Sequence, residues 1–398
     1  MRDVREKALY NRAMLKEFDL SVLTEPLLEW YEKNKRVLPW RELATPYRVW
    51  VSEIMLQQTR VEAVKPFFER FTNRLPDVQA LADCPEDELL KLWEGLGYYN
   101  RVRNMQKAAI QVMEQHGGEL PADYNALLQL KGIGSYTAGA IASIAYQIPV
   151  PAVDGNVLRI LTRVAEDDTD IMKASFRKQV EEQLMAYMQS DAFTSEASGT
   201  FNQALMELGA MVCVPNGAPK CEECPWKQIC LAKRKDRISE LPVKAKAKER
   251  RIEKRTVLVI RDGEQVAIRK RPSKGLLAGL YELPNTEGYL TQEEALVYVK
   301  ERTLSPIRIQ KLPEAKHIFS HVEWQMQGYA ILIEEPEQLR ENLHAPKAEA
   351  DVKVTQSESE MIFVEAETSE QKYAIPAAFA AYAKYMGIKI GQERFLEE

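Results

Sequence analysis

The sequence predicts a mainly helical fold followed by a smaller α+β domain, and three observations support this prediction. Residues 24–232 contain amphipathic runs, among them ADYNALLQL and NVLRILTRV, separated by short Gly, Pro or Asp breaks. From residue 256 the pattern changes to short β-rich runs such as TVLVI, QVAIRK and YAILIE, with helical candidates at QEEALVYVKERTL and AAFAAYAKYMG. A Lys- and Ala-rich stretch lies between the two patterns. We therefore expect a helical domain at 1–232, a basic linker at 233–255 and an α+β domain at 256–398.

The composition is typical of a globular protein rather than of a secreted or membrane protein. The 398 residues, 45% of them hydrophobic, are enough to bury the cores of roughly two or three domains. No run of 18 apolar residues occurs, and the N-terminal stretch MRDVREKALYNRAMLKEFDL is broken up by charges. We therefore expect no membrane span, no signal peptide and a cytoplasmic location.

The charge is unevenly distributed along the chain. The net charge is −5, but residues 231–255 hold eleven Lys and Arg against four Asp and Glu and so carry +7, while the parts on either side carry −6 each. Lys and Arg are the residues that contact nucleic-acid phosphates. On composition alone, a solvated linker is the preferred interpretation of this stretch.

Four of the five cysteines lie within 18 residues, at Cys213, Cys221, Cys224 and Cys230, and Cys84 lies far from them. This clustering indicates one metal site in a reducing compartment rather than a set of disulfides. Thiolates suit zinc or an iron–sulfur cluster, and from spacing alone zinc is the commoner of the two.

The segment LLQLKGIGSYTAGAIASIAY predicts two helices joined by a tight turn. Asp123 can cap the first helix, Gly132 and Gly134 allow a turn with positive φ, and the second helix is expected to begin near Ser135. Unpaired backbone N–H groups at such a turn can bind a phosphate without reading the bases. This is the helix-hairpin-helix pattern, although a plain helix turn is the alternative.

The segment TPYRVWVSEIMLQQTRV predicts a helix that carries a candidate general acid. Thr45 is suited to the N-cap and Pro46 to the first helical position, and helical spacing places Val49, Glu53 and Gln57 on one face. If Glu53 faces inward among its apolar neighbours, desolvation raises its pKa into the range of a general acid. The alternative is an ordinary solvated glutamate.

A second carboxylate follows the apolar run VPAV. Asp154 directly precedes a predicted helix, so we expect it to be an N-cap. A carboxylate held in this way could also stabilise a developing positive charge.

In the order Glu53, Gly132-x-Gly134, Asp154 and the cysteine cluster, the chain resembles the helix-hairpin-helix DNA glycosylases that carry an iron–sulfur cluster. Within that superfamily it is similar to the MutY-type adenine DNA glycosylases. The resemblance implies a six-helix barrel with the hairpin at about 45–147 and an iron–sulfur domain built from the N-terminal helices and about 148–232. It also implies a [4Fe-4S] cluster on the four cysteines. The usual spacing of the first two is six residues; here it is seven, and we expect the extra residue to bulge outward.

Two features favour the adenine enzyme over endonuclease III-like relatives. Tyr136 stands where bifunctional relatives carry the lysine that forms a Schiff base, which implies a monofunctional glycosylase. In the C-terminal half, Phe319, Ser320 and His321 are similar to the loop with which the family recognises 8-oxoguanine opposite adenine. That half resembles a Nudix fold at GLLAGLYELPN but lacks the metal-binding signature that should follow, so we expect recognition rather than hydrolysis.

Carried over residue by residue, the resemblance gives Glu53 the role of protonating adenine N7 and then managing the attacking water. Asp154 would stabilise the cationic sugar, with Tyr136 and Asn156 orienting the two carboxyl groups. The resemblance further implies three groups of substrate residues: Trp40, Arg41 and Gln203 in the adenine pocket, Gln58 and Tyr98 in the base stack, and Gly132, Gly134 and Ser135 on a DNA phosphate.

We therefore expect a monomeric bacterial enzyme of base excision repair, associated with the nucleoid, that acts on double-stranded DNA with 8-oxoguanine:A or G:A mispairs. Three alternatives remain at this point. They are an endonuclease III-like glycosylase and lyase for oxidised pyrimidines, a non-catalytic zinc-dependent DNA-binding scaffold, and a nucleotide pyrophosphohydrolase built on the C-terminal domain.

Overall fold

The computed structural model describes residues 18–245, 249–334 and 361–387. Residues 1–17 of the expected helical domain and residues 246–248 of the expected linker lie outside the described residues. The described residues form two compact units, one from 18–83 and 103–245 and the other from 84–102, 249–334 and 361–387. In the part of the chain that the structure describes, no helix is long and apolar enough to cross a membrane.

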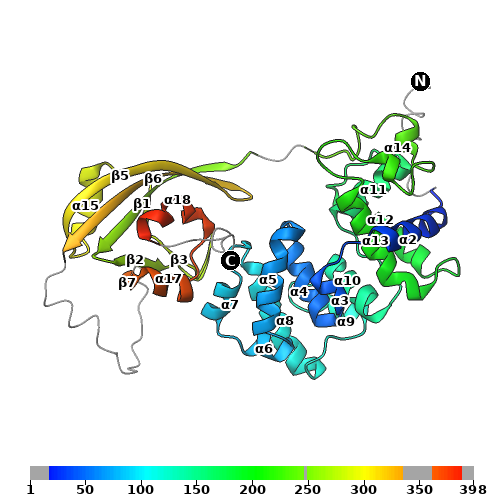
Figure 1. The fold of residues 1–398 in the computed structure, drawn as a ribbon, viewed down its shortest axis with the longest axis horizontal. Coiled ribbons are helices and arrows are strands. Elements are labelled where there is room, and N and C mark those ends of the chain that lie inside the picture. Colours follow the sequence, from blue (N-terminus) through cyan, green and yellow to red (C-terminus); the bar gives the residue numbers. More distant parts are fainter. Residues whose placement is uncertain (1–17, 246–248, 335–360, 388–398) are drawn as a thin grey trace. The chain divides into compact units, whose positions relative to one another are not determined.

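The first unit is helical, as the sequence predicts (Figure 1). Its helices are α2 (Ser21–Asn34), α3 (Pro39–Glu42), α4 (Pro46–Leu56), α5 (Val61–Arg74), α6 (Val78–Asp83), α8 (Asn100–His116), α9 (Tyr124–Leu128), α10 (Ser135–Tyr146), α11 (Gly155–Ala165), α12 (Ala174–Met188), α13 (Ser198–Met211) and α14 (Leu231–Arg234).

Helices α10 and α13 lie at the centre of the packing in this unit. Helix α10 packs against both α4 and α13, and α13 also packs against α11 and α2. The nine residues Val157–Ala165 of α11 are all buried, including the polar side chains of Arg159, Thr162 and Arg163. Helices α4, α10 and α11 therefore project side chains into one interior region.

The turn between α9 and α10 agrees with the expected hairpin, with one correction. The side chain of Asp123 accepts a hydrogen bond from the amide N–H of Ala126 and so caps α9, and Gly132 has φ +78°. Gly134 does not adopt positive φ. It is the N-cap of α10, with φ −99° and ψ −179°, an extended conformation that any residue can adopt.

Close helix packing requires a glycine one turn further along α10. A Cβ on Gly139 would lie 2.0 Å from the carbonyl oxygen of Pro151, a backbone atom that cannot move aside. The glycine lets the chain that leads to Asp154 lie directly against α10.

The second unit is an α+β domain, as the sequence predicts, and its described residues form a seven-stranded sheet. The strands are β1 (Arg251–Asp262), β2 (Gln265–Lys270), β3 (Tyr281–Glu282), β4 (Asn285–Glu287), β5 (Ser305–Ile318), β6 (Val322–Glu334) and β7 (Met361–Glu365). The main order is β3-β2-β1-β6-β5, in which β1 and β6 are parallel, while β4 pairs with β1 and β7 with β2. The last five residues of the expected linker, 251–255, belong to β1.

Helices cover both faces of this sheet (Figure 1). Val257 and Val259 of β1 pack on one face with α18 (Ala380–Met386), whereas Leu258 and Ile260 pack on the other face with α15 (Gln292–Lys300). The alternation follows from the period of two along a strand. A strand covered on both sides therefore reads as the continuous apolar run TVLVI.

Residues 84–102 group with the second unit, whereas the sequence placed them in the helical domain. They include α7 (Glu86–Leu92), and this helix and the turn after it make specific contacts with the chain that follows α17 (Ala366–Lys372). Nζ of Lys91 donates to the carbonyl oxygen of Tyr373 at 2.8 Å, and the N–H of Ile375 donates to Oε1 of Glu94 at 2.7 Å. These contacts join residues more than 280 positions apart, so nothing in the local sequence predicts them.

Candidate active site

Helix α4 places Glu53 inside the first unit. Thr45 caps the helix with Pro46 at its first position, as expected, and eight of its residues, including Glu53, are buried. Glu53 is 5% exposed, which rules out the solvated alternative. Burial raises the pKa of Glu53 to about 7, and nearby Asp154 also acts to raise it, while a hydrogen bond from Tyr136 and the charge of Arg41 act to lower it. A carboxyl group with this pKa exchanges protons near neutral pH.

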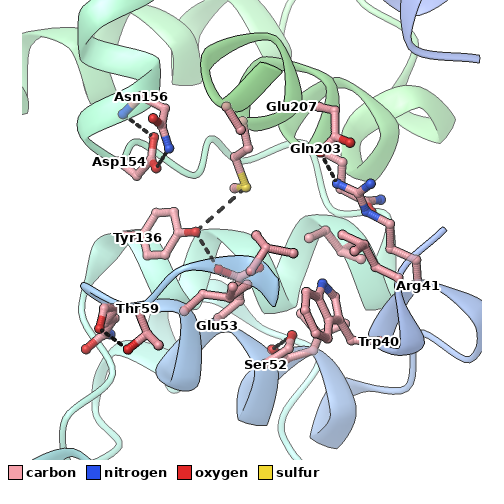
Figure 2. Close-up of a pocket in the computed structure, with 18 of the residues that line it drawn as sticks. Trp40, Arg41, Ser52, Glu53, Thr59, Tyr136, Asp154, Asn156, Gln203 and Glu207 are labelled. Carbon is pink, nitrogen blue, oxygen red and sulfur yellow. Dashed lines mark hydrogen bonds and ion pairs between the residues drawn. The ribbon is translucent and has the colours of Figure 1, made fainter. Parts of the chain in front are cut away.

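Tyr136 donates a hydrogen bond to one of the two expected carboxylates. It lies on α10, between Glu53 and Asp154, and its hydroxyl donates to Oε2 of Glu53 (Figure 2). The hydroxyl oxygen of Tyr136 also lies 3.7 Å from Sδ of Met206. Burial and the negative charges of both carboxylates raise the pKa of Tyr136 well above its ordinary value, so the phenol keeps its proton.

Asp154 is the N-cap of α11, as the sequence predicts, and its orientation is fixed by Asn156. Oδ1 accepts hydrogen bonds from the backbone N–H groups of Asn156 and Val157, both at 2.8 Å, and Oδ2 accepts from Nδ2 of Asn156 at 2.7 Å. Oδ1 of Asn156 in turn accepts from Arg159 at 2.8 Å. Burial raises the pKa of Asp154, although these hydrogen bonds and the charge of Arg159 oppose the shift.

These side chains line one cavity of about 590 Å³, within the usual range for a small-molecule site. The cavity brings together eight of the residues expected from the sequence. They are Trp40, Arg41, Glu53, Gln58, Tyr136, Asp154, Asn156 and Gln203. Figure 2 shows Trp40, Arg41, Gln203 and Glu207 gathered in one part of the site and Asp154 with Asn156 in another.

The cavity also contains residues that the sequence analysis missed. Arg36, Met206 and Glu207 line it, and Glu207 accepts hydrogen bonds from Arg36 and Arg41. One sequence signal could have found Glu207, because it lies four positions after Gln203 and so on the same face of α13. No comparable signal identifies Arg36.

The residues expected in the base stack and in the lesion-reading loop include four from the second unit: Tyr98, Phe319, Ser320 and His321. Tyr98 is 47% exposed and has φ +48°, and its hydroxyl lies 3.0 Å from Oγ of Ser320. Arg101 stacks on the Tyr98 ring at 5.4 Å and donates to the carbonyl oxygens of Leu96 and Gly97. Tyr98 and Ser320 are thus neighbours although 222 positions separate them.

Phe319 and His321 flank that serine. The Phe319 ring packs edge-on against the buried ring of Trp324 at 5.0 Å and against His317 at 4.7 Å. His321 is exposed, and its carbonyl oxygen accepts from the N–H of Arg251 at 3.0 Å. The loop therefore exposes Ser320 and His321, while the packing of Phe319 on Trp324 holds the loop against the sheet.

At the hairpin, Ser135 begins α10 and its hydroxyl donates to Oε1 of Glu181 at 2.8 Å. Gly132 must be a glycine here, because in addition to its positive φ an added Cβ would lie 2.7 Å from Cβ of Asn104. The first amide groups of α10 have no carbonyl partner within their own helix, as at any helix start. These amides remain our candidate phosphate site.

The four clustered cysteines line one small cavity. Among the described residues, no group of three or more His, Cys, Asp or Glu side chains is arranged to hold a single metal ion. Four soft thiol donors around one cavity suit an iron–sulfur cluster, whose ligands bind several iron atoms rather than one. Nη1 of Arg163 lies 3.2 Å from Sγ of Cys213 and can support that thiolate.

The seven-residue loop before Cys221 lies at the surface. The N–H of Lys220 donates to the carbonyl oxygen of Val212 at 3.0 Å and closes the loop at its base. Residues 215–218 are exposed, and Gly217 makes the turn with φ +77°. The loop extends outward, as expected for an extra residue.

Comparison with known proteins gives matches in both units. Residues 51–188 match the HhH-GPD superfamily of base excision DNA repair proteins, and residues 256–385 match the NUDIX domain. The adenine DNA glycosylase of Mus musculus is 35% identical over 378 aligned positions, gaps included, and the match covers 80% of this chain and 72% of the relative. The adenine DNA glycosylase of Buchnera aphidicola from Acyrthosiphon pisum is 34% identical over 301 residues, 75% of this chain and 83% of the relative.

Proposed function

Because the chain belongs to the adenine DNA glycosylase family, we propose that it hydrolyses the N-glycosidic bond of adenine paired with 8-oxoguanine or guanine in double-stranded DNA. The observation that carries the proposal is the buried Glu53, whose pKa is about 7, in one cavity with Asp154. One group can donate a proton and the other can stabilise positive charge, which are the two requirements of glycosidic hydrolysis.

Protonation of the base is the first step. Because burial raises the pKa of Glu53 to about 7, the protonated acid is available near neutral pH without an acidic medium. The proton passes to N7 of the extruded adenine, which makes the base a better leaving group. Tyr136 holds the acid in place through its hydroxyl.

The sugar then carries positive charge, and Asp154 lies in the same cavity to stabilise it. Its hydrogen bonds from Asn156 and Val157 fix the carboxylate before the reaction begins. Glu53, now deprotonated, accepts a proton from the attacking water. Tyr136 cannot form an imine with the sugar, so the products are free adenine and an abasic site in an uncut strand.

Duplex DNA must release the adenine before it can enter the cavity. We assign Gln58 and Tyr98 to the base stack, and both have positive φ, at +60° and +48°. Such backbone strain in residues other than glycine is concentrated at functional sites. Phe319, Ser320 and His321 would read the opposing 8-oxoguanine, which fits the contact between Tyr98 and Ser320.

We also assign Cys213, Cys221, Cys224 and Cys230 to a [4Fe-4S] cluster, supported by their shared cavity. When bound, such a cluster cross-links the loop through its thiolates and has no part in the hydrolysis. The role we assign to it is therefore structural.

A glycosylase assay tests the proposal. Purified full-length protein is incubated with duplexes that carry A opposite 8-oxoguanine, G or C, and alkali then reveals abasic sites. We expect release of adenine opposite 8-oxoguanine and G, little opposite C, and none from Glu53→Gln. If the wild-type protein binds these duplexes and leaves adenine in place in all of them, the proposal is wrong.

A further inference from the structure

Glu207 is a buried carboxylate in the cavity that the proposed reaction does not use. It lies on α13, is 1% exposed, and accepts four hydrogen bonds from two arginines. Oε1 accepts from the backbone N–H of Arg36 at 3.0 Å and from its Nε at 2.8 Å, and Oε2 accepts from Nη2 of Arg36 and Nη2 of Arg41, both at 2.9 Å. Burial acts to raise the pKa of Glu207, but the hydrogen bonds and the charge of Arg41 lower it to about 2. Glu207 is therefore ionised at any working pH.

The two arginines lie on a segment that has little structure of its own. Between α2 and α4 the only regular element is the single turn α3. Nη1 of Arg41 donates to the carbonyl oxygen of Arg36 at 3.1 Å, so the two residues also hold each other. Because Glu207 binds both, the long helix α13 fixes the position of this segment.

One hydrogen-bond donor of Arg36, the Nη1 group, does not bind Glu207. Nε and Nη2 of Arg36 both face Glu207, and the hydrogen bonds among the described residues include none from its Nη1. Arg36 and Glu207 line the same cavity as Glu53. A guanidinium is planar, so fixing two of its nitrogens also fixes the direction of the third.

We propose that Glu207 is a positioning residue for base selection, which aims Nη1 of Arg36 at a ring-nitrogen acceptor of the extruded purine. The inference rests on the proposed function, because it takes adenine as the base in this cavity. Adenine N1 carries no proton and can accept a hydrogen bond, whereas N1 of hypoxanthine carries a proton. A fixed donor at this edge pairs with N1 of adenine. In hypoxanthine it faces the N1–H group, a second donor, and neither N–H group then has an acceptor.

Hypoxanthine is therefore the discriminating probe. Single-turnover base release is measured with full-length wild type and Glu207→Gln on duplexes that carry adenine or hypoxanthine at the same position opposite 8-oxoguanine. The amide keeps the size of the carboxylate but loses the charge that holds both arginines. We expect the ratio of the adenine rate to the hypoxanthine rate to fall about tenfold or more.

Glu166 offers a matched control. It is also buried and also pairs with two cations, Lys235 at 2.5 Å and Arg237 at 3.1 Å, but it does not line the cavity. Glu166→Gln should leave the ratio of the two rates unchanged.

The outcomes separate positioning from simple stabilisation. If Glu207→Gln slows both bases equally and the ratio stays constant, Glu207 only supports the fold and the inference is wrong. If this variant fails to fold, Arg36→Lys tests the same idea, because lysine keeps the charge without the planar fork; an unchanged ratio there overturns the inference as well. A wild-type protein that releases no adenine would instead refute the proposed function.

Discussion

Replacing Glu53 by glutamine should stabilise the protein at high pH while abolishing its proposed activity. Burial raises the pKa of Glu53 from 4.5 to about 7, so ionisation is less favourable in the folded state than in the unfolded chain. At about 1.4 kcal/mol for each unit by which the pKa is shifted, ionisation of Glu53 costs about 3 kcal/mol more in the folded state than in the unfolded chain. The sign follows from linkage: below about pH 4.5 the penalty is absent, it grows as the pH rises, and it is complete above about pH 7.

Thermal unfolding of the full chain at about pH 5 and about pH 8 measures this effect. Glutamine cannot ionise, so the stability of Glu53→Gln relative to wild type should rise by about 2 to 3 kcal/mol between the two pH values. For a domain of this size that gain corresponds to roughly 5 to 10 °C in the melting temperature of the helical unit.

The exposed Glu114 on α8 provides the control, because Glu114→Gln changes the same chemical group where no burial acts. Its effect should be the same at both pH values within a few tenths of a kcal/mol. If Glu53→Gln shows no greater pH dependence than Glu114→Gln, Glu53 is not held as a neutral acid, and the proposed proton donor must be another group.

Three further predictions concern other parts of the molecule. Tyr136→Phe removes a hydrogen bond that lowers the pKa of Glu53, so the alkaline limb of the rate profile should move to higher pH, and a shift to lower pH would contradict the assigned contact. Gly139→Ala places a Cβ against a backbone oxygen and should cost about 3 kcal/mol or more in urea unfolding, whereas Gly134→Ala, where a Cβ meets nothing within 4 Å, should cost under about 1 kcal/mol. Alanine at all three positions of 319–321 should reduce the preference for 8-oxoguanine:A over G:A in the glycosylase assay, and an unchanged preference would remove the lesion-reading role.

The sequence by itself determined the features that depend on neighbouring residues. The caps at Thr45, Asp123 and Asp154 and the β-rich run TVLVI follow from short-range rules, and the structure confirms them. The cysteine cluster was equally visible because its members lie close together in the chain.

Only the tertiary structure decided the chemistry of the cavity. Whether Glu53 is a surface carboxylate or an acid with a pKa of about 7 depends on the helices packed around it, and no local pattern specifies that burial. Glu207 and Arg36 are 171 positions apart, and their contact exists because α13 packs beside the segment that follows α2. Burial and long-range pairing are properties of the assembled fold, and they set the free energy of charge in the site.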